Sequence, residues 1–333
     1  MRFFRLTPYP GNSSDCLAPS QKSAVVHHNE LLYLADLVKQ QSGIQVSADK
    51  AYLFESRLLP IARQFGHATI SDLVQRVRGS GDPAIIEAII EAMTTNESFF
   101  FRDQHPFDRF GDFMLPELKK ARGGERQLRI WSAAASTGQE PYSLSMCVEE
   151  AGSEYRTWRV EILATDISGE ALDRAREGIY SQFEVQRGLP VQMLVKYFDQ
   201  NGARWRIKDS LRKRIEFRRH NLVGNNRSLG LFDIIFIRNV LIYFDMDTKR
   251  RILNDVAAML RDPGFVVLGG TESVLGVTSE LKAVEGKRGI FVRNAVQQER
   301  RARPGERAAG ERAADVSGAP DTSKIDRRIA FQR

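Results

Sequence analysis

The sequence predicts an α/β fold in which a doubly wound, mostly parallel sheet follows a small all-α domain. Helical patterns fill residues 28–93. After residue 128, short apolar runs alternate with helical patterns, which is typical of a parallel sheet covered by helices. Residues from about 197 to 220 instead alternate charged and apolar side chains around an Asn201-Gly202 turn, and this pattern indicates a small antiparallel β insertion.

The all-α domain is predicted from amphipathic periodicity and helix-end signals. Leu31, Leu34 and Val38 fall on one helical face, and Gly43 follows as the C-cap. Asp82-Pro83 is a typical start for the last helix of the domain. Residues 1–27 are expected to form a flexible arm, and residues 94–127 a linker with a connecting helix.

The sheet domain is predicted over residues 128–295. Its strands are expected at residues 128–134, 160–166, 232–240 and 264–270, followed by an antiparallel hairpin from ELKAVEG and RGIFVRN. Each is a short apolar run bounded by loop residues, as buried strands are. Residues 296–333 contain almost no large apolar side chains and are expected to form a disordered basic tail.

Composition narrows the class of protein. The length of 333 residues suggests about two domains, and the net charge of +7 favours an acidic partner, whether nucleic acid, anionic lipid or protein. The two cysteines, Cys16 and Cys147, lie far apart, so neither a disulfide framework nor a metal site is expected. No apolar run suits a membrane span and no signal peptide is recognisable, so we expect a cytoplasmic protein that is not inserted in a membrane.

The loop after the first strand is a candidate ligand site. The small residues from Ala133 to Gly138 let a ligand approach the backbone at the C-terminal edge of the sheet. The loop has neither the GxGxxG pattern of dinucleotide-binding folds nor the lysine of a P-loop. Glu140 would repel a pyrophosphate but suits a cation or an amino group. Its alternative role is that of a first-turn acid favoured by the helix dipole.

Polar residues also follow the second and third strands. Asp166 can accept hydrogen bonds from ribose hydroxyls or cap the next helix. Arg238 and Asn239 lie at the same predicted edge, and Tyr243 follows in the loop, where a core role is the alternative. The run from Arg238 is not the Asn/Asp-Pro-Pro-aromatic signature of methylation on base amino groups, which disfavours a nucleic-acid N-methyltransferase.

The segment TTNESFFFRD, residues 94–103, is the most unusual one. Its three consecutive phenylalanines cannot all face one core, so they need two packing partners, such as the two domains. Asn96, Ser98 and Arg102 are polar side chains threaded through it. The alternative is an interdomain linker with a capping box.

Together these residues resemble the chemotaxis receptor methyltransferase (CheR) family over about residues 31–294. The motifs TTNESFFFRD, STGQEPYSLSM, ILATDIS and FDIIFIRNVLIYFD carry the resemblance, in this order. It implies a Rossmann-like, class I S-adenosylmethionine-dependent methyltransferase fold. It also implies that the chain forms glutamyl methyl esters on chemoreceptors and releases S-adenosylhomocysteine.

The resemblance further implies roles for particular residues. Arg102 and Tyr243 would act at the reacting centre, and the basic helix with Lys50, Arg57 and Arg63 would bind the receptor. The positions implied to bind the cofactor are Asn96, Ser98, Arg102, Glu140, Asp166, Asn221, Leu222, Arg238 and Asn239.

This sequence departs from the family pattern in three places. Ser98 stands where many members have threonine, and Gln139 replaces a glutamate beside Glu140. The loop in DQNGARW is short, whereas members that dock onto a receptor pentapeptide have a glycine-rich loop there. The short loop indicates a pentapeptide-independent member. We also expect a monomer with no nucleic-acid partner.

The chemistry requires no general base, because a glutamate carboxylate is already ionised at neutral pH. The absence of histidine from the four motifs fits this requirement. Three alternatives remain open: a catalytically silent cofactor-sensing adaptor, an RNA or small-molecule methyltransferase, and a nicotinamide oxidoreductase, which the loop chemistry disfavours.

Overall fold

The computed structural model describes residues 26–295. The expected arm lies outside this range except for its last two residues, and the expected tail lies outside it entirely. The described chain divides into two compact units, and the main border between them follows Met93. The first unit holds residues 26–41 and 46–93, and the second holds residues 42–45 and 94–295. The assignment of residues 42–45 to the second unit is not evident from the sequence.

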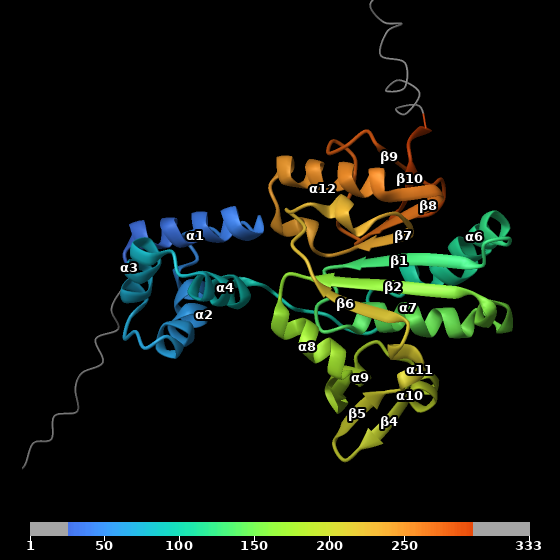
Figure 1. Cartoon of the computed structure of the whole chain (residues 1–333), viewed down its shortest axis with the longest axis horizontal. Coiled ribbons are helices and arrows are strands. Elements are labelled where there is room, and N and C mark those ends of the chain that lie inside the picture. Colours follow the sequence, from blue (N-terminus) through green and yellow to red (C-terminus); the bar gives the residue numbers. More distant parts are fainter. Residues whose placement is uncertain (1–25, 296–333) are drawn as a thin grey trace, which may run out of the picture. The chain divides into compact units, whose positions relative to one another are not determined.

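The described part of the first unit is all-helical, as the periodicity predicts. Its apolar faces bury residues such as Leu34, Phe54 and Leu58. Thr69 forms a capping box with Asp72 at the start of the third helix, which satisfies two main-chain N–H groups. The helices are α1 (His28–Ser42), α2 (Ala51–Gln64), α3 (Ile70–Ser80) and α4 (Pro83–Met93), labelled in Figure 1.

The second unit is built on a seven-stranded sheet with the order β6-β2-β1-β7-β8-β10-β9 (Figure 1). Neighbours from β6 to β8 are parallel, and β10 is antiparallel to β8 and β9. This confirms the predicted doubly wound, mostly parallel sheet with a terminal hairpin. The strands are β1 (Gln127–Ala133), β2 (Arg159–Asp166), β6 (Ile215–Arg219), β7 (Phe232–Ile237), β8 (Leu260–Leu268), β9 (Leu281–Ala283) and β10 (Ile290–Arg293).

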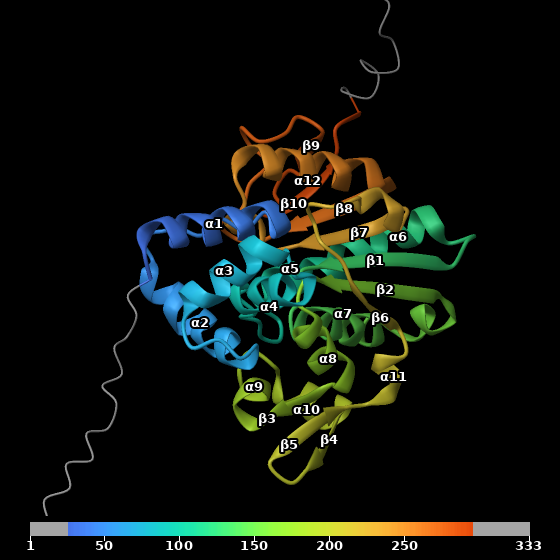
Figure 2. The ribbon, with the colours of Figure 1, turned by 60° about the vertical axis from the view of Figure 1, so that its left-hand side comes forward.

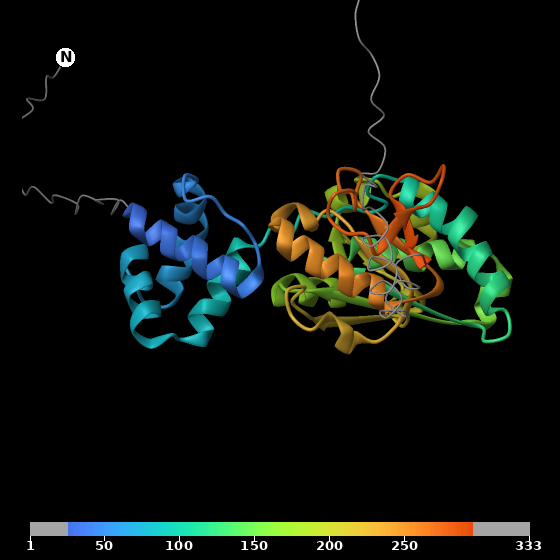
Figure 3. The same cartoon turned by 90° about the horizontal axis from the view of Figure 1, so that it is seen from above.

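Helices cover both faces of this sheet. Ile130 of β1 packs in the same core as Leu144 of α7, whereas the next residue, Trp131, packs with Val256 of α12. Successive strand residues thus alternate between two cores, as the pleat requires. Figure 3 shows α12 in orange from above. The elements are α5 (His105–Arg109), η1 (Phe110–Met114), α6 (Leu115–Arg122), α7 (Gln139–Glu150), η2 (Ser153–Thr157), α8 (Gly169–Glu177), η3 (Asn226–Leu229), η4 (Leu241–Tyr243) and α12 (Met246–Met259).

A three-stranded antiparallel sheet lies on the β6 side of the large sheet (Figure 2). It differs at both ends from the expected range of residues 197–220. A strand before that range joins it, and β6, inside the range, pairs in parallel with β2 of the large sheet. Alternation of residue types reveals a strand but not its partner. The elements are β3 (Ile179–Ser181), α9 (Gln182–Gln186), α10 (Val191–Tyr197), β4 (Phe198–Asn201), β5 (Arg204–Ile207) and α11 (Asp209–Arg212).

Candidate functional site

The carboxyl ends of three neighbouring strands lie side by side in the large sheet. Ala133 at the end of β1 is opposite Thr165 of β2 and Ile237 of β7. From β1 the strand order continues through β2 to β6 on one side and through β7 to β8 on the other. Ligands bind outside such a switch point, so the crevice beyond β1 and β7 is the expected site.

The loop between β1 and α7 is buried at this edge of the sheet, and only Ala134 within it is half-buried. Ala134 and Ser136 both adopt left-handed conformations, with φ of 60° and 51°. Gly138 has φ of 95°, and a Cβ there would lie 2.9 Å from Cβ of Ala175 and 3.1 Å from the hydroxyl of Tyr180. A larger residue at Gly138 would therefore force the loop away from its neighbours, so glycine is required for this loop path.

Asp166 is locked in place at the end of β2. One carboxylate oxygen accepts the Ser136 N–H at 2.8 Å, and the other accepts the Ser168 N–H at 2.9 Å. The expected alternative role for Asp166, as helix cap, belongs instead to Ser168, whose hydroxyl accepts the Ala171 N–H. Asp166 is thus positioned by the loops around it.

Asn96 joins the segment of residues 94–103 to these two loops. Its carbonyl accepts a hydrogen bond from the Ser136 hydroxyl at 3.0 Å, and its amide donates to the Ser168 hydroxyl at 3.3 Å. Ser98 is half-buried on the same segment. The segment therefore lies along the ligand edge of the sheet. A segment that only connected two domains would not require these contacts.

The three phenylalanines of this segment have different partners within the second unit. Phe100 packs edge-to-face on Tyr180 and Phe198 beside the small sheet, at centroid distances of 5.0 and 5.6 Å. Phe101 packs on Phe107 at 5.3 Å, in the core of the large sheet. The Phe99 ring packs against the guanidinium groups of Arg102 and Arg187. The expected need for two packing partners is thus met by the two sheets of one unit.

Arg102 is one of the two guanidinium groups that lie over Phe99. Its carbon Cζ is 5.4 Å from the ring centroid, and its Nη1 donates to the Glu97 carbonyl at 2.9 Å. Arg187 contributes the other guanidinium, at 4.3 Å from the same centroid. The half-buried Arg102 side chain is therefore oriented by its own segment.

A buried ion pair joins Glu140 to Arg238. The Arg238 side chain is 1% exposed, and its Nη1 donates to Glu140 at 2.9 Å, while the Ser132 hydroxyl donates to the other Glu140 oxygen at 2.7 Å. Burial raises the pKa of Glu140, although Arg238 and Ser132 act in the opposite direction. Glu140 is thus far more constrained than a first-turn acid at a helix surface.

Arg238 also reaches the segment that carries Arg102. Its Nη2 donates to the Arg102 carbonyl at 2.7 Å and to the Asp103 carboxylate at 2.9 Å. Only Nε of this guanidinium is buried without a partner. Both Nη atoms are thus engaged with the protein, and the side chain connects the end of β7, the start of α7 and residues 102–103.

The structure adds one residue, Glu272, that the sequence analysis missed. Its carboxylate accepts main-chain N–H groups of Asn239, Val240 and Leu241 at 2.8–3.0 Å, and that of Gly269 at 2.8 Å. These bonds hold Asn239 in a left-handed conformation with φ of 56°. The signal that could have revealed Glu272 is an acid two residues after Gly270, at the end of the fourth predicted strand.

The remaining predicted residues of the second unit lie on two loops that share an apolar cluster. Leu222, after β6, is 7% exposed and packs in the same cluster as Phe244, which follows Tyr243. The Asn221 side chain accepts the Val223 N–H at 3.1 Å, which shapes its loop. Tyr243 is half-buried at the end of η4.

The three predicted receptor-binding residues lie in the first unit. Lys50 and Arg63 are exposed. Arg57 is half-buried, and its Nη1 donates to the carbonyls of Met93 at 3.1 Å and Ala92 at 3.4 Å. Arg57 therefore binds the C-terminal end of α4, where helix carbonyls lack intrahelical partners.

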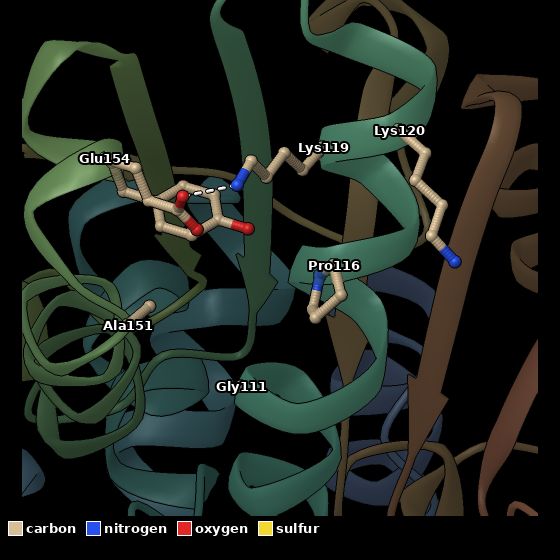
Figure 4. Close-up of a pocket in the computed structure, with 7 residues that line it drawn as sticks. Gly111, Pro116, Lys119, Lys120, Ala151 and Glu154 are labelled. Carbon is tan, nitrogen blue, oxygen red and sulfur yellow. Dashed lines mark hydrogen bonds and ion pairs between the residues drawn. The ribbon is translucent and has the colours of Figure 1, made fainter.

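A cavity of about 410 Å³ lies elsewhere in the second unit (Figure 4). An ion pair between Lys119 and Glu154 spans it. None of the predicted site residues lines this cavity, so we do not assign the cofactor to it. Its lining residues are Gly111, Pro116, Lys119, Lys120, Ala151, Glu154 and Tyr155.

The fold and these side chains define the class of protein. The site combines a loop of small residues with left-handed backbone after β1, a fixed carboxylate at the end of β2 and a second, buried carboxylate on α7. This set suits a nucleoside with a cationic group and contains no lysine for a phosphate chain. Together with the sheet order, it fits a Rossmann-like methyltransferase that uses S-adenosylmethionine.

Comparison with known proteins leads to one family. The model for the SAM-binding domain of CheR methyltransferases matches residues 96–290, and the model for their all-alpha domain matches residues 29–94. The chain is 42% identical over 260 residues to chemotaxis protein methyltransferase 1 of Pseudomonas aeruginosa, covering 77% of this chain and 94% of that protein. The chain is also 40% identical over 257 residues to chemotaxis protein methyltransferase 1 of Vibrio cholerae serotype O1. That match covers 76% of this chain and 92% of that protein.

This chain belongs to the CheR methyltransferase family. The predicted function, SAM-dependent methylation of chemoreceptors, is thereby confirmed, together with the cofactor and the fold class. The oxidoreductase alternative is excluded. Within residues 26–295, no helix has the length and apolar character needed to cross a membrane.

Proposed function

We propose that this chain forms methyl esters on glutamate side chains of chemoreceptors in the crevice outside β1 and β7. The anchoring of Arg238 supports this proposal most strongly. Its guanidinium binds Glu140, Asp103 and the Arg102 carbonyl, so the segment with Arg102 is tied to the strand ends near Asp166. Groups for cofactor and substrate thus converge on one edge of the sheet.

We propose that some residues of the site contact the cofactor directly and that others hold those residues in place. Asp166 accepts ribose hydroxyls, and the small side chains of the loop after β1 allow the ligand to come close to the backbone. Arg238 acts through its hold on Glu140 and residue 103, and Glu272 acts through its hold on the loop of Asn239. The full proposed set is Asn96, Ser98, Arg102, Glu140, Asp166, Asn221, Leu222, Arg238 and Asn239.

The chemistry is proposed to depend on alignment. The bound cofactor supplies a methyl group on a positively charged sulfonium. The accepting carboxylate, with a reference pKa of about 4.3, is ionised at neutral pH and needs no general base. The chain therefore has to orient the reactants and exclude water, and alignment of this kind can supply much of the rate. Arg102 orients the carboxylate, and Tyr243 positions the reacting groups.

We assign the receptor-facing surface to α2. Arg63 on α2 and Lys50 at its N-cap are exposed, and their positive charge complements acidic receptor helices. Arg57, also predicted for this surface, contributes by holding the end of α4. The turn between β4 and β5 contains only Gly202 and Ala203, which supports independence from a receptor pentapeptide. We further propose that the protein acts as a cytoplasmic monomer.

A methyl-transfer assay tests the proposal. Incubation with radiolabelled cofactor and receptor-containing membranes should give base-labile label in the receptor. Removal of the receptor's C-terminal pentapeptide should leave the rate unchanged. Cofactor binding without any label would instead identify a silent sensor, and label in added RNA would identify a different substrate class.

The role of Arg102 is tested by an Arg102→Ala variant. We expect turnover to fall by about 100-fold, because misalignment of the reactants has effects of this size. Arg187→Ala is the matched control, since Arg187 stacks on the same Phe99 ring but is not assigned to the reaction. Full turnover of Arg102→Ala with normal cofactor binding would contradict the assigned role.

A further inference from the structure

Residues 42–45, which are the last residue of α1 and the first three residues of the connection to α2, belong to the second unit, although the chain on both sides belongs to the first. They are Ser42, Gly43, Ile44 and Gln45. Ser42 is 2% exposed, Gly43 is buried and Ile44 is half-buried. Burial of this kind is unusual for a short connection, because connections between helices normally run over the surface. From the sequence, only Gly43 was assigned a role, as the C-cap of the first helix.

These residues contact two loops of the proposed active site. The Gln45 N–H donates to the main-chain carbonyl of Tyr243 at 2.8 Å. Ile44 packs against the apolar cluster that contains Leu222 and Phe244. One end of the segment thus binds the backbone of Tyr243, and its middle packs on the residues that flank both Asn221 and Tyr243 in the chain.

Gly43 shows how closely the segment fits. Its φ is 75°, and a Cβ at this position would lie 2.5 Å from Cγ1 of Val223 and 3.1 Å from Cδ1 of Phe244. Val223 is β-branched and rotates little about χ1. A side chain at Gly43 would therefore have to move the loop after β6, the loop after β7, or both.

The segment complements Glu272 on the loop after β7. Glu272 binds the N–H groups of Asn239, Val240 and Leu241, which form the first half of that loop. The contacts of Gln45 and Gly43 fall on Tyr243 and the next residue, at the far end of the same loop. Each half of the loop therefore has its own support.

We propose that residues 42–45 are a positioning element that fixes the loop of Asn221 and Leu222 relative to the loop of Tyr243. This inference rests on the proposed roles of those residues in cofactor binding and reaction. The segment touches neither the cofactor nor the substrate. It acts through the two loops, so its loss affects both the affinity for the cofactor product and the rate of transfer.

The test compares Gly43→Ala with Gly66→Ala in the full chain. Both glycines have left-handed φ, 75° and 78°, but a Cβ at Gly66 would meet no atom within 4 Å. The two variants therefore share the conformational penalty, and only Gly43→Ala disturbs the loops. We expect Gly43→Ala to weaken binding of S-adenosylhomocysteine, measured by calorimetry, by about tenfold. Turnover should also fall by about tenfold or more, while Gly66→Ala matches the wild type in both.

A second measurement needs no cofactor. Hydrogen exchange of the free protein should accelerate at residues 238–245 in Gly43→Ala and remain unchanged in Gly66→Ala. Val223→Ala removes the atom nearest the new Cβ, so the double variant Gly43→Ala/Val223→Ala should recover part of the lost affinity and of the exchange protection. A general loss of stability would instead accelerate exchange throughout the second unit rather than only at residues 238–245.

The outcomes separate this inference from the proposed function. Wild-type binding, turnover and exchange in Gly43→Ala, or equal losses in Gly66→Ala, would overturn it. A different outcome would support the positioning element while contradicting the proposed substrate. In that outcome Gly43→Ala alters exchange and Val223→Ala rescues it, but the wild-type chain labels no receptor.

Discussion

At the scale of single residues, backbone strain is concentrated at the site. Seven non-glycine residues of the described chain have positive φ, and only Arg126 lies away from the site loops. Strain of this kind costs roughly 1–3 kcal/mol per residue and persists only where surrounding contacts impose it. For Ser136, Asp103 and Asn239 these contacts include hydrogen bonds with Asp166, Arg238 and Glu272, respectively. The six others are Phe101, Asp103, Gln104, Ala134, Ser136 and Asn239.

Glu272→Gln should weaken this support. The amide has one acceptor oxygen and no charge, so it cannot replace a carboxylate that accepts four main-chain N–H groups. We expect a loss of about 2–3 kcal/mol in the free energy of unfolding and weaker binding of S-adenosylhomocysteine, measured by denaturation and calorimetry. Glu285→Gln is the control, because it removes the same charge from an exposed residue of the final hairpin. It should alter neither the unfolding free energy nor the binding of S-adenosylhomocysteine. Equal stability of the two variants would exclude the assigned support.

Glu140→Gln should change how stability depends on pH. Burial raises the folded-state pKa of Glu140 above its usual 4.5, so the stability linked to this carboxyl is complete below about pH 4.5. It is lost as the pH rises through the raised folded value. Thermal unfolding between pH 4 and 7 should therefore show the wild type losing stability relative to Glu140→Gln. A wild type that gains on the variant over this range would mean that attraction to Arg238 outweighs burial.

At the scale of elements, α2 and its N-cap residue Lys50 carry side chains with different tasks. Arg57 faces inward and binds the carbonyl end of α4, whereas Lys50 and Arg63 face solvent. The sequence predicts a basic helix face but does not show which arginine faces inward. The spacing of Arg57 and Arg63 does not reveal which of them lies near unpaired helix carbonyls. The packing of α2 beside α4 decides it.

Arg57→Ala should destabilise the first unit by about 1–3 kcal/mol, because the last carbonyls of α4 lose a charged donor. Arg63→Ala, on the same helix, should leave the unfolding free energy within about 0.5 kcal/mol of the wild type. It should instead raise the KM for receptor, with little change in turnover. Chemical denaturation and the methyl-transfer assay measure the two effects. The opposite pattern, with Arg63→Ala the less stable variant, would reverse these assignments.

At the scale of the whole molecule, the division into units does not follow the chain continuously. The second unit includes residues 42–45, which are separated from its remaining residues by most of the first unit. A cut at the apparent border, after Met93, therefore removes part of the second unit. It also uncovers the apolar cluster that contains Phe244.

A fragment of residues 94–295 should bind S-adenosylhomocysteine about tenfold more weakly than the chain of residues 1–295, and should melt at a lower temperature. The longer control also lacks the tail, so the comparison isolates the missing N-terminal residues. Calorimetry and thermal unfolding give both quantities. Equal affinity and equal melting temperature would show that the second unit is complete without residues 42–45.

The sequence by itself determined the parts of this protein that depend on local patterns. Helical periodicity revealed the all-α unit, apolar runs revealed the parallel strands, and four motifs identified the family and its cofactor. These signals are local because side-chain periodicity, capping and loop composition act over a few residues.

Only the tertiary structure decided which distant groups meet. It assigned β6 to the large sheet, paired Arg238 with Glu140 and residue 103, and brought Glu272 to the loop of Asn239. It also placed residues 42–45 against the loops of the site. These contacts join residues far apart in the chain, and strand pairing, ion pairing and burial leave no period in the sequence from which their partners could be read.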